Sequence, residues 1–178
     1  MNIFLGIIRF DGQLIDSGKL KQAAFLSPQW IPDHQGCFID GAVGIVNTQR
    51  FITDECSHGL LPMQHELSNC VIVADAYLAE REILCAALSQ PLHLSSAELI
   101  LYSYLKWGQD CTQHLRGAFS FAIWDKNKRR LFLAIDQFGQ HPCLYAYQPG
   151  KYFIFANEMS GFRVFLSQLT LNEDMFAL

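Results

Sequence analysis

The sequence has little charge, and it lacks an excess of basic residues. Charged side chains make up 17% of the 178 residues, and the formal net charge is −4. Proteins that bind nucleic acid carry clustered Lys and Arg, because the phosphate backbone dominates their affinity. The basic cluster KNKRR at 126–130 lies between two apolar runs, which favours a solvated hairpin tip over a binding patch. We therefore expect no nucleic-acid partner.

The sequence also lacks long hydrophobic runs. No segment approaches the ~20 apolar residues that a membrane-spanning helix requires. The apolar stretch 3–8 is too short for the core of a signal peptide, and it is followed by Arg9. We expect no membrane partner and a cytoplasmic protein. The 51% hydrophobic content is enough for the core of one globular domain.

Cysteine spacing argues against the common metal and redox motifs. No C-x-x-C occurs among the six cysteines, and without a secretion signal we expect reduced thiols. The densest group of potential ligands has a spacing that fits no standard zinc site, so we expect no metal or other cofactor in this chain. That group consists of Cys56, His58, His65 and Cys70.

Local patterns predict an α+β domain. Near-continuous apolar residues predict a strand at 3–10, and 41–46 and 70–73 are further candidates. Two hairpins are expected later in the chain, one pairing 118–124 with 131–135 and the other pairing 143–147 with 151–156. Strands early, helices in the middle and hairpins later are typical of α+β sheet layers.

Two helices are expected in the middle of the chain. Residues 80–88 place apolar side chains at the spacing of one helical face. A second helix follows Ser95, which is positioned to form a capping box with Glu98, and Gly108 is a suitable stop. The body of this helix is apolar on most sides, which predicts that it lies between other layers.

The opening MNIFLGIIRFDGQ resembles the start of class II glutamine amidotransferases of the asparagine synthetase family, which begin M-C-G-I-x-G. The run LRGAFSFAIWDKNKRRLFLAIDQFGQHPCLYAY is similar to that family's L-x-G-x-F-A-F-A-I-W-D and R-D-x-F-G-x-x-P-L-Y-Y segments. SSAELILYSYLKWGQDC and IFANEMSGF also follow its pattern, so the resemblance covers essentially the whole chain. It implies two stacked antiparallel sheets between helical layers, the αββα sandwich of N-terminal nucleophile hydrolases.

The resemblance predicts a degenerate catalytic site. In that family Cys follows the initiator Met, and its thiolate attacks the glutamine amide while its α-amino group is the base. Asn2 stands here instead, and a carboxamide has no ionisable nucleophilic atom at neutral pH. The family's N-G-E oxyanion motif aligns with Ala74, Asp75 and Ala76. Ala74 cannot donate a hydrogen bond, and Asp75 would place a carboxylate beside developing negative charge.

Three more positions follow from the same resemblance. Ser96 replaces the Asp that binds the glutamine α-amino group in the family. Arg50 is retained where the family binds the glutamine carboxylate, although a structural salt bridge explains it equally well. Cys37, in a loop expected near the site, is a candidate replacement nucleophile, but an internal cysteine has no free α-amine to act as base.

Three functions remain open. A non-catalytic glutaminase-like domain that serves an ATP-dependent amide-forming protein explains a degenerate site on an intact scaffold. In this respect the sequence resembles the N-terminal domains of lasso-peptide cyclases and, more distantly, of β-lactam synthetase. The glutamine-hydrolysing half of an asparagine synthetase is the enzymatic alternative. A small-molecule-binding or regulatory domain that uses Arg50 to bind a carboxylate is the third.

The resemblance also implies a partner. The expected partner is a C-terminal synthetase-like domain, in the same gene or as a separate chain, which would bind ATP and Mg²⁺. No S-G-G-x-D-S phosphate-binding loop occurs in this sequence. Residues 1–170 are expected to form the glutaminase-like domain, and 171–178 the start of a linker. The apolar composition predicts an exposed hydrophobic face, so a homo-oligomer is an alternative to the synthetase partner.

Overall fold

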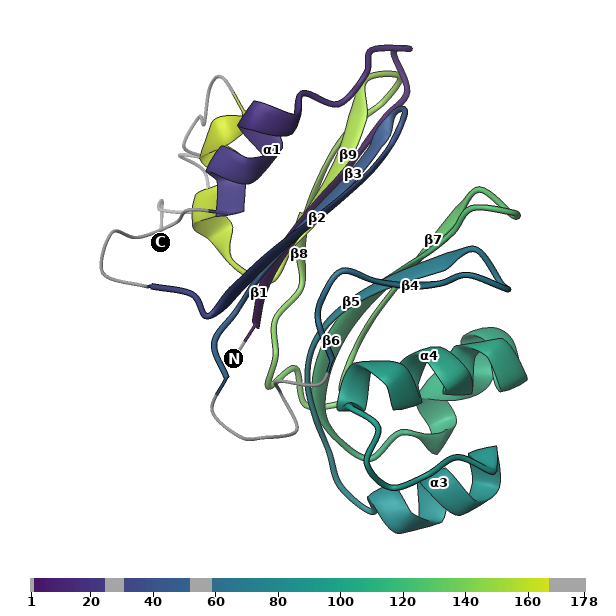
Figure 1. The fold of residues 1–178 in the computed structure, drawn as a ribbon. Helices are drawn as coiled ribbons and strands as arrows, with labels where there is room; N and C mark the ends of the chain where they lie inside the picture. The colour runs from purple at the N-terminus through teal and green to yellow at the C-terminus, as the bar shows by residue number, and fades with distance from the viewer. Residues whose placement is uncertain (1, 25–30, 52–58, 167–178) are drawn as a thin grey trace, which may run out of the picture.

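The computed structural model describes residues 2–24, 31–51 and 59–166. Two antiparallel β-sheets pack face to face, and each carries helices on its outer face (Figure 1). The order of layers is therefore helix, sheet, sheet, helix, as the family resemblance implied. Within the described residues, no helix combines the length and the apolar character that crossing a bilayer requires.

Sheet A has five strands in the order β2-β3-β1-β9-β8. Strand β1 is central because it pairs with both β3 and β9, and its near-continuous apolar sequence reflects cover on both faces. Gly6 of β1 lies under the Phe155 ring, where a Cβ atom would come within 2.0 Å of a ring carbon. The bounds of the strands are β1 Asn2–Arg9, β2 His34–Asp40, β3 Val43–Gln49, β8 Leu144–Gln148 and β9 Tyr152–Ala156.

Sheet B has four strands in the order β4-β5-β6-β7. Side chains of β5 alternate between two cores, as the pleat of a strand requires. Ile72 and Ala74 face the helical layer, whereas Val71 and Val73 face sheet A. The bounds of the strands are β4 Met63–His65, β5 Cys70–Leu78, β6 Gly117–Asp125 and β7 Arg130–Ile135.

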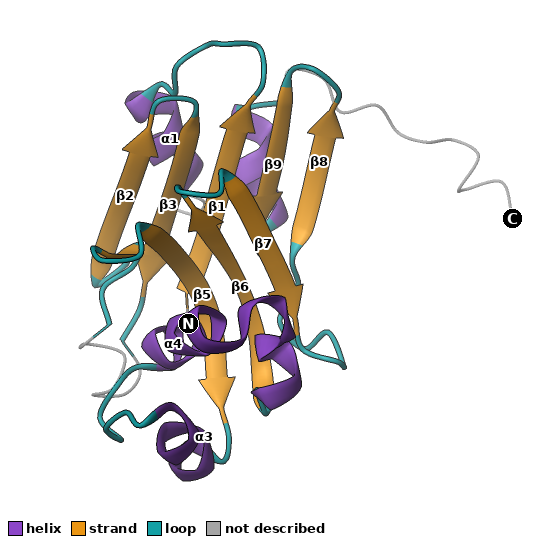
Figure 2. Ribbon diagram, turned by 90° about the vertical axis from the view of Figure 1, so that its right-hand side faces the viewer, coloured by secondary structure: helices purple, strands orange, loops and turns teal. Residues whose placement is uncertain are grey.

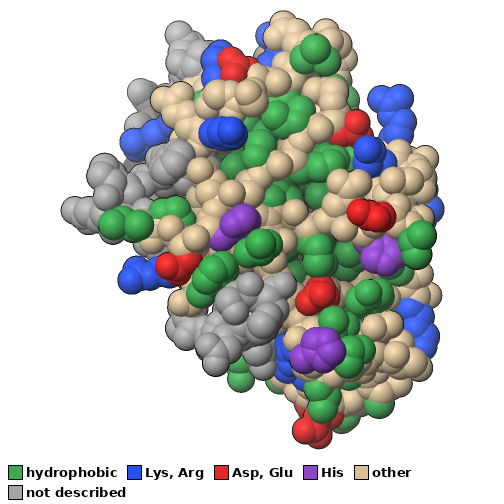
Figure 3. All heavy atoms as spheres, in the orientation of Figure 1, with side chains coloured by type: hydrophobic (Ala, Val, Ile, Leu, Met, Phe, Trp, Pro, Cys, Tyr) green, Lys and Arg blue, Asp and Glu red, His purple; other side chains and the backbone are tan. Residues whose placement is uncertain are grey.

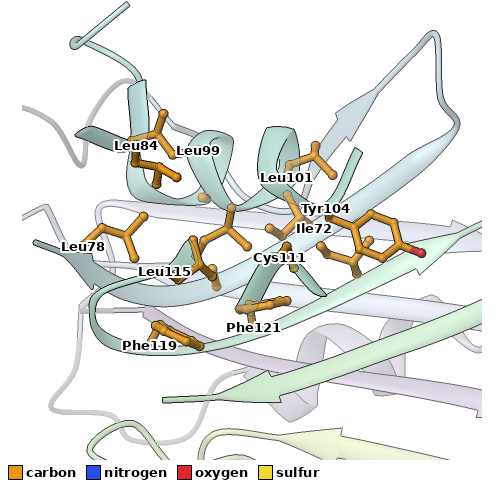
Figure 4. Packing of buried hydrophobic residues seen from close by; sticks show 14 of the residues in the cluster. Ile72, Leu78, Leu84, Leu99, Leu101, Tyr104, Cys111, Leu115, Phe119 and Phe121 are labelled. Carbon is orange, nitrogen blue, oxygen red and sulfur yellow. The ribbon is translucent and has the colours of Figure 1, made fainter. Parts of the chain in front are cut away.

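Helices cover the outer faces of both sheets (Figure 2). Helices α3 and α4 lie on sheet B, and α1 and the 3-10 helix η2 lie on sheet A. Figure 4 shows Leu99, Leu101 and Tyr104 of α4 packed over Phe119 and Phe121 of β6. The bounds of the helices are α1 Ser17–Ala24, α3 Arg81–Leu88, α4 Ser96–Trp107, η1 Gly108–His114 and η2 Met159–Val164.

The local sequence patterns predicted the hairpins and the helix cap correctly. Both predicted hairpins form, as β6–β7 and β8–β9, and the capping box of Ser95 and Glu98 is present. The predicted strand 70–73 is too short, because β5 continues to Leu78 along its whole contact with β6. The patterns missed α1 and the strands β2 and β4. Strand β2 is a half-exposed edge strand and β4 has three residues, so neither carries a clear hydrophobic period.

The capping box gives a test of the fold. The Ser95 hydroxyl accepts the backbone N–H of Glu98, and the Glu98 carboxylate accepts the backbone N–H of Ser95 at 2.7 Å. We expect Ser95→Ala to lower the free energy of unfolding by about 1 kcal/mol, because the first turn of α4 loses its cap. Urea denaturation measures this change. Ser17→Ala, at an exposed serine in α1, is the control and should change stability by less than about 0.5 kcal/mol.

Candidate functional site

Residue 2 lies where the two sheets meet. The backbone N–H of Asn2 donates to Oδ1 of Asp75 at 2.9 Å, and its side-chain amide donates to the carbonyl of Ala74 at 2.8 Å. The Asn157 side chain donates to the carbonyl of Asn2 at 2.7 Å and accepts the N–H of Phe4 at 2.8 Å. The backbone and the side chain of residue 2 are therefore both held by hydrogen bonds.

A histidine completes this group. Nδ1 of His141 lies 2.6 Å from Oδ2 of Asp75, and the two side chains are 29% and 15% exposed. The Asp75 carboxylate therefore has one oxygen on residue 2 and the other on His141. We call Asn2, Asp75, His141 and Asn157 the residue-2 network.

The side chains of positions 74 and 75 lie on opposite faces of β5. The Ala74 side chain lies in the core between sheet B and the helices, and only its carbonyl reaches Asn2. Asp75 is the residue whose side chain faces sheet A and contacts residue 2. A side chain that donates to the site from β5 would therefore have to stand at position 75 rather than 74. The carboxylate at 75 accepts a hydrogen bond from residue 2 in this structure.

Asp136 holds the loop that carries His141. Its carboxyl is buried, and burial opposes ionisation. Backbone N–H groups that donate to the carboxylate outweigh this effect and hold the pKa of Asp136 below its usual value. The donors belong to Phe119, Phe138, Gln140 and His141. Asp136 thus fixes the start of β6 and the loop between β7 and β8, and so positions His141.

Arg50 and Ser96 occupy different surroundings. Arg50 is exposed and directly follows Gln49, which pairs with Asn2 across β1 and β3. Arg50 therefore lies at the same end of sheet A as residue 2. The hydroxyl of Ser96 accepts a hydrogen bond from the Arg81 guanidinium at 3.1 Å, and Arg81 also donates to the carbonyl of Leu94. Ser96 thus joins the start of α4 to α3, and the nearby cation disfavours an ammonium group there.

Cys37 lies in strand β2 rather than in a loop. It pairs with Val46, which pairs in turn with Leu5 of β1. Strand spacing then places Cys37 about 10 Å along the sheet and about 10 Å across it from Asn2. Desolvation raises the pKa of the Cys37 thiol above its ordinary value. Both observations disfavour Cys37 as a replacement nucleophile, because attack requires proximity and a thiolate.

The group considered as metal ligands is only partly described. His65 and Cys70 face each other as partners in β4 and β5, and the His65 ring lies 2.9 Å from the Ser68 hydroxyl. Cys56 and His58 lie outside the described residues, as do the expected linker residues 171–178. Within the described part of the chain, no three His, Cys, Asp or Glu side chains are grouped to hold a metal ion.

Two members of the residue-2 network were missed from the sequence. His141 stands before Pro142 in the loop after the F-G dipeptide, and Asn157 directly follows β9. Neither position carries a local pattern that predicts chemistry. Both contact residues far along the chain, at separations of 66 and 155 residues, so only the folded structure brings them together.

Asp136 gives a test of how the network is supported. We expect Asp136→Asn to lower the free energy of unfolding by about 2 kcal/mol at pH 7, because charge-assisted hydrogen bonds in a buried site are lost. The pKa of Asp136 is lowered in the folded state, so its contribution is complete above the unfolded pKa of about 3.9. The contribution is lost as the pH falls through the lower folded value.

Urea denaturation of both proteins between pH 7 and pH 2.5 measures this difference. The gap between the wild type and the variant should narrow below about pH 4. Asp110→Asn, which makes the same substitution at an exposed residue, is the control. A gap that stays constant through the acid range would contradict a role for the ionised carboxylate.

Comparisons with known proteins agree with this fold. The family described as glutamine amidotransferase domain matches residues 14–177. Two relatives from Bacillus subtilis strain 168 carry the name asparagine synthetase, glutamine-hydrolyzing. Synthetase 3 is 42% identical over 65 residues, which is 36% of this chain and 10% of its own length. Synthetase 2 is 32% identical over 130 residues, which is 72% of this chain and 17% of its own length. The chain therefore spans only a small part of these relatives.

A solved structure shows the shared architecture. The glutamine phosphoribosylpyrophosphate amidotransferase of B. subtilis, determined with ADP and GMP, superposes with a TM-score of 0.56 at 16% identity. The superposition covers 90% of this chain and 37% of the other. At this identity the likeness concerns the fold alone, and it confirms the predicted sandwich. The family match over residues 14–177 shows that this chain belongs to the glutamine amidotransferase domain family, as a class II domain of the asparagine synthetase type.

Proposed function

We propose that this domain does not hydrolyse glutamine and acts as the structural or docking partner of an ATP-dependent, amide-forming synthetase-like domain. One observation carries the proposal. The residue at the nucleophile position is Asn2, whose side-chain amide donates to the Ala74 carbonyl while its N–H donates to Asp75. A carboxamide held in this way offers no nucleophile for a covalent intermediate.

The surroundings of residue 2 are equally unsuited to acyl transfer. A tetrahedral oxyanion needs preorganised donors, and removing one donor typically costs a factor of about 10²–10³ in rate. The side chain that β5 directs toward residue 2 is the Asp75 carboxylate, which accepts hydrogen bonds and repels negative charge. Restoring a thiol at position 2 would leave this acceptor beside it.

The scaffold supports a structural role. The residue-2 network joins β1, β5, the β7–β8 loop and the residue after β9 through hydrogen bonds of 2.6 to 2.9 Å. A site rebuilt as a set of internal contacts is expected when the fold is needed and the chemistry is not. ATP and Mg²⁺ would bind to the synthetase-like partner, because this sequence has no S-G-G-x-D-S loop.

Glutamine hydrolysis is the second candidate. The relatives' names as glutamine-hydrolyzing enzymes favour it, and so does the position of Arg50 beside the residue-2 end of sheet A. The two functions differ in a directly measurable reaction.

The purified protein should release no glutamate from millimolar glutamine above a buffer control. Asn2→Cys, shown by mass spectrometry to have lost Met1, should remain inactive because Asp75 still faces residue 2. A coupled glutamate assay measures both proteins. Hydrolysis by the unmodified protein that is abolished by Cys37→Ala would establish the replacement nucleophile instead. Saturable glutamine binding lost in Arg50→Ala would favour a regulatory domain.

Exposed hydrophobic side chains next to the residue-2 network fit a partner surface. Tyr77 is 74% exposed and follows Asp75 by two residues on the same face of β5. Phe138 is 76% exposed and lies in the loop that carries His141. A synthetase-like domain docked at this end of the sandwich would bury both side chains and cover the former catalytic site.

Binding to a synthetase-like domain from the same genome, supplied in trans, tests this surface. We expect micromolar binding by calorimetry, weakened at least tenfold by Tyr77→Asp or Phe138→Asp, because a charge would be buried in an apolar contact. Leu67→Asp is the matched control, since Leu67 is 93% exposed in the turn before β5, at the opposite end of that strand. A monomeric protein that shows no binding to the synthetase-like domain at micromolar concentration would contradict the docking role.

A further inference from the structure

We propose that the cavity between the turn ends of the two sheets binds an aromatic molecule that carries one anionic group. This cavity lies between the end of β1, the β2–β3 turn and the β6–β7 hairpin. Asn2 is at the other end of β1, about 20 Å away at the spacing of an extended strand. The proposed site is therefore separate from the residue-2 network and does not rest on the function proposed above.

The cavity has the size and the apolar wall of a small-molecule site. Its volume is about 800 Å³, within the usual range for ligand pockets. Figure 3 shows hydrophobic side chains in the hollow between the two halves of the molecule. Val43 and Phe153 line it from sheet A, and Trp124, Leu131 and Leu133 line it from sheet B. With Phe10, three aromatic side chains line the cavity, and they favour a planar ring as the apolar part of the ligand.

The charge around the cavity is opposite to that of the whole protein. Four cationic side chains line it against one anionic side chain, Asp40, so the lining carries +3 in a protein of net charge −4. Arg9 is paired with Asp11, and Lys126 is paired with Asp40. Arg129 and Arg130 have no salt bridge within the described part of the chain. These two guanidinium groups are available to an anion.

The backbone at Arg129 adds an independent observation. Arg129 has φ of 48°, in the left-handed region that glycine adopts without a steric penalty. A long side chain gains nothing for the turn in that conformation, because a glycine would close the same hairpin with less strain. Strain at a residue that lines a cavity is a recurrent mark of a functional position.

Trp124 contributes to the cavity wall from a buried position. It is 7% exposed and packs in the core between the two sheets. The apolar walls and the two guanidinium groups without a salt bridge together define an aromatic anion.

The test compares two probes of the same shape. We expect 2-naphthalenesulfonate to bind with Kd of about 0.1 mM, and neutral 2-naphthalenemethanol to bind at least about fivefold more weakly, since one charge contact is worth roughly that factor. Calorimetry gives the affinities. Amide and indole NMR spectra locate the site, with the Trp124 indole resonance assigned through Trp124→Phe. That resonance should shift on binding.

Two variants separate binding from folding. Arg129→Gly should weaken sulfonate binding about fivefold while leaving Tm unchanged or raised by about 2 °C, because the left-handed conformation is no longer strained. Arg130→Gln should weaken binding by a similar factor. Lys128→Gln is the matched control, since it removes a charge from the same turn but Lys128 does not line the cavity. Its affinity should equal that of the wild type.

Several results would overturn the proposal. Equal affinity for the charged and neutral probes would remove the role of the anion. If both arginine variants bound the sulfonate as well as the wild type, the two guanidinium groups would have no role in binding. If Lys128→Gln lost as much affinity as the arginine variants, the sulfonate would be attracted by the charge of the whole turn rather than by the cavity. A Trp124 indole resonance that does not move would place the probe elsewhere, and no binding at millimolar concentration would exclude the site. None of these results bears on glutamine hydrolysis or on the synthetase-like partner.

Discussion

The hydrogen bond from the N–H of residue 2 to Asp75 is the contact on which the rest of the site depends. It joins the central strand of sheet A to β5 of sheet B, so it fixes the two sheets relative to each other at that end. Asp75 is held in turn by His141, and the backbone of His141 is held by Asp136. Each link restricts the next, so residue 2 has one well-defined environment.

The packing that maintains this fold does not depend on the chemistry of residue 2. The fold of an amidotransferase domain requires β1 between two layers, and the glycine under Phe155 together with the capped α4 keeps those layers in place. None of these features requires a nucleophile. Asn2 and Asp75 are compatible with the packing but place an amide and a carboxylate where acyl transfer needs a thiolate and a donor. The fold by itself therefore does not fix the reaction.

The two ends of the sandwich are built differently. At the residue-2 end, short hydrogen bonds connect the sheets. At the turn end, the Lys126–Asp40 ion pair at 3.4 Å spans the sheets, and a cavity separates them behind it. The buried core of Phe4, Ile45, Val73 and Phe155 lies between these ends. A polar closure on one side and an opening on the other make the two ends of the domain chemically distinct.

The sequence by itself determined what depends on neighbouring residues. The Ser95–Glu98 capping box, the stop at Gly108 and both late hairpins were predictable, because caps and tight turns are set by a few adjacent side chains. The extended family pattern implied the layers, and it implied that Asn2 stands at the family's nucleophile position. The short or half-exposed strands β2 and β4 were not predictable, since they lack a hydrophobic period.

Only the tertiary structure decided which side chains meet. It showed that Asp75 rather than Ala74 faces residue 2, because a strand directs successive side chains to opposite faces and the alignment did not specify which face was which. It brought in His141 and Asn157 from 66 and 155 residues away, and it placed Arg129 and Arg130 beside Trp124 around one cavity. Contacts of this kind depend on how whole sheets pack, and that information is spread over the chain.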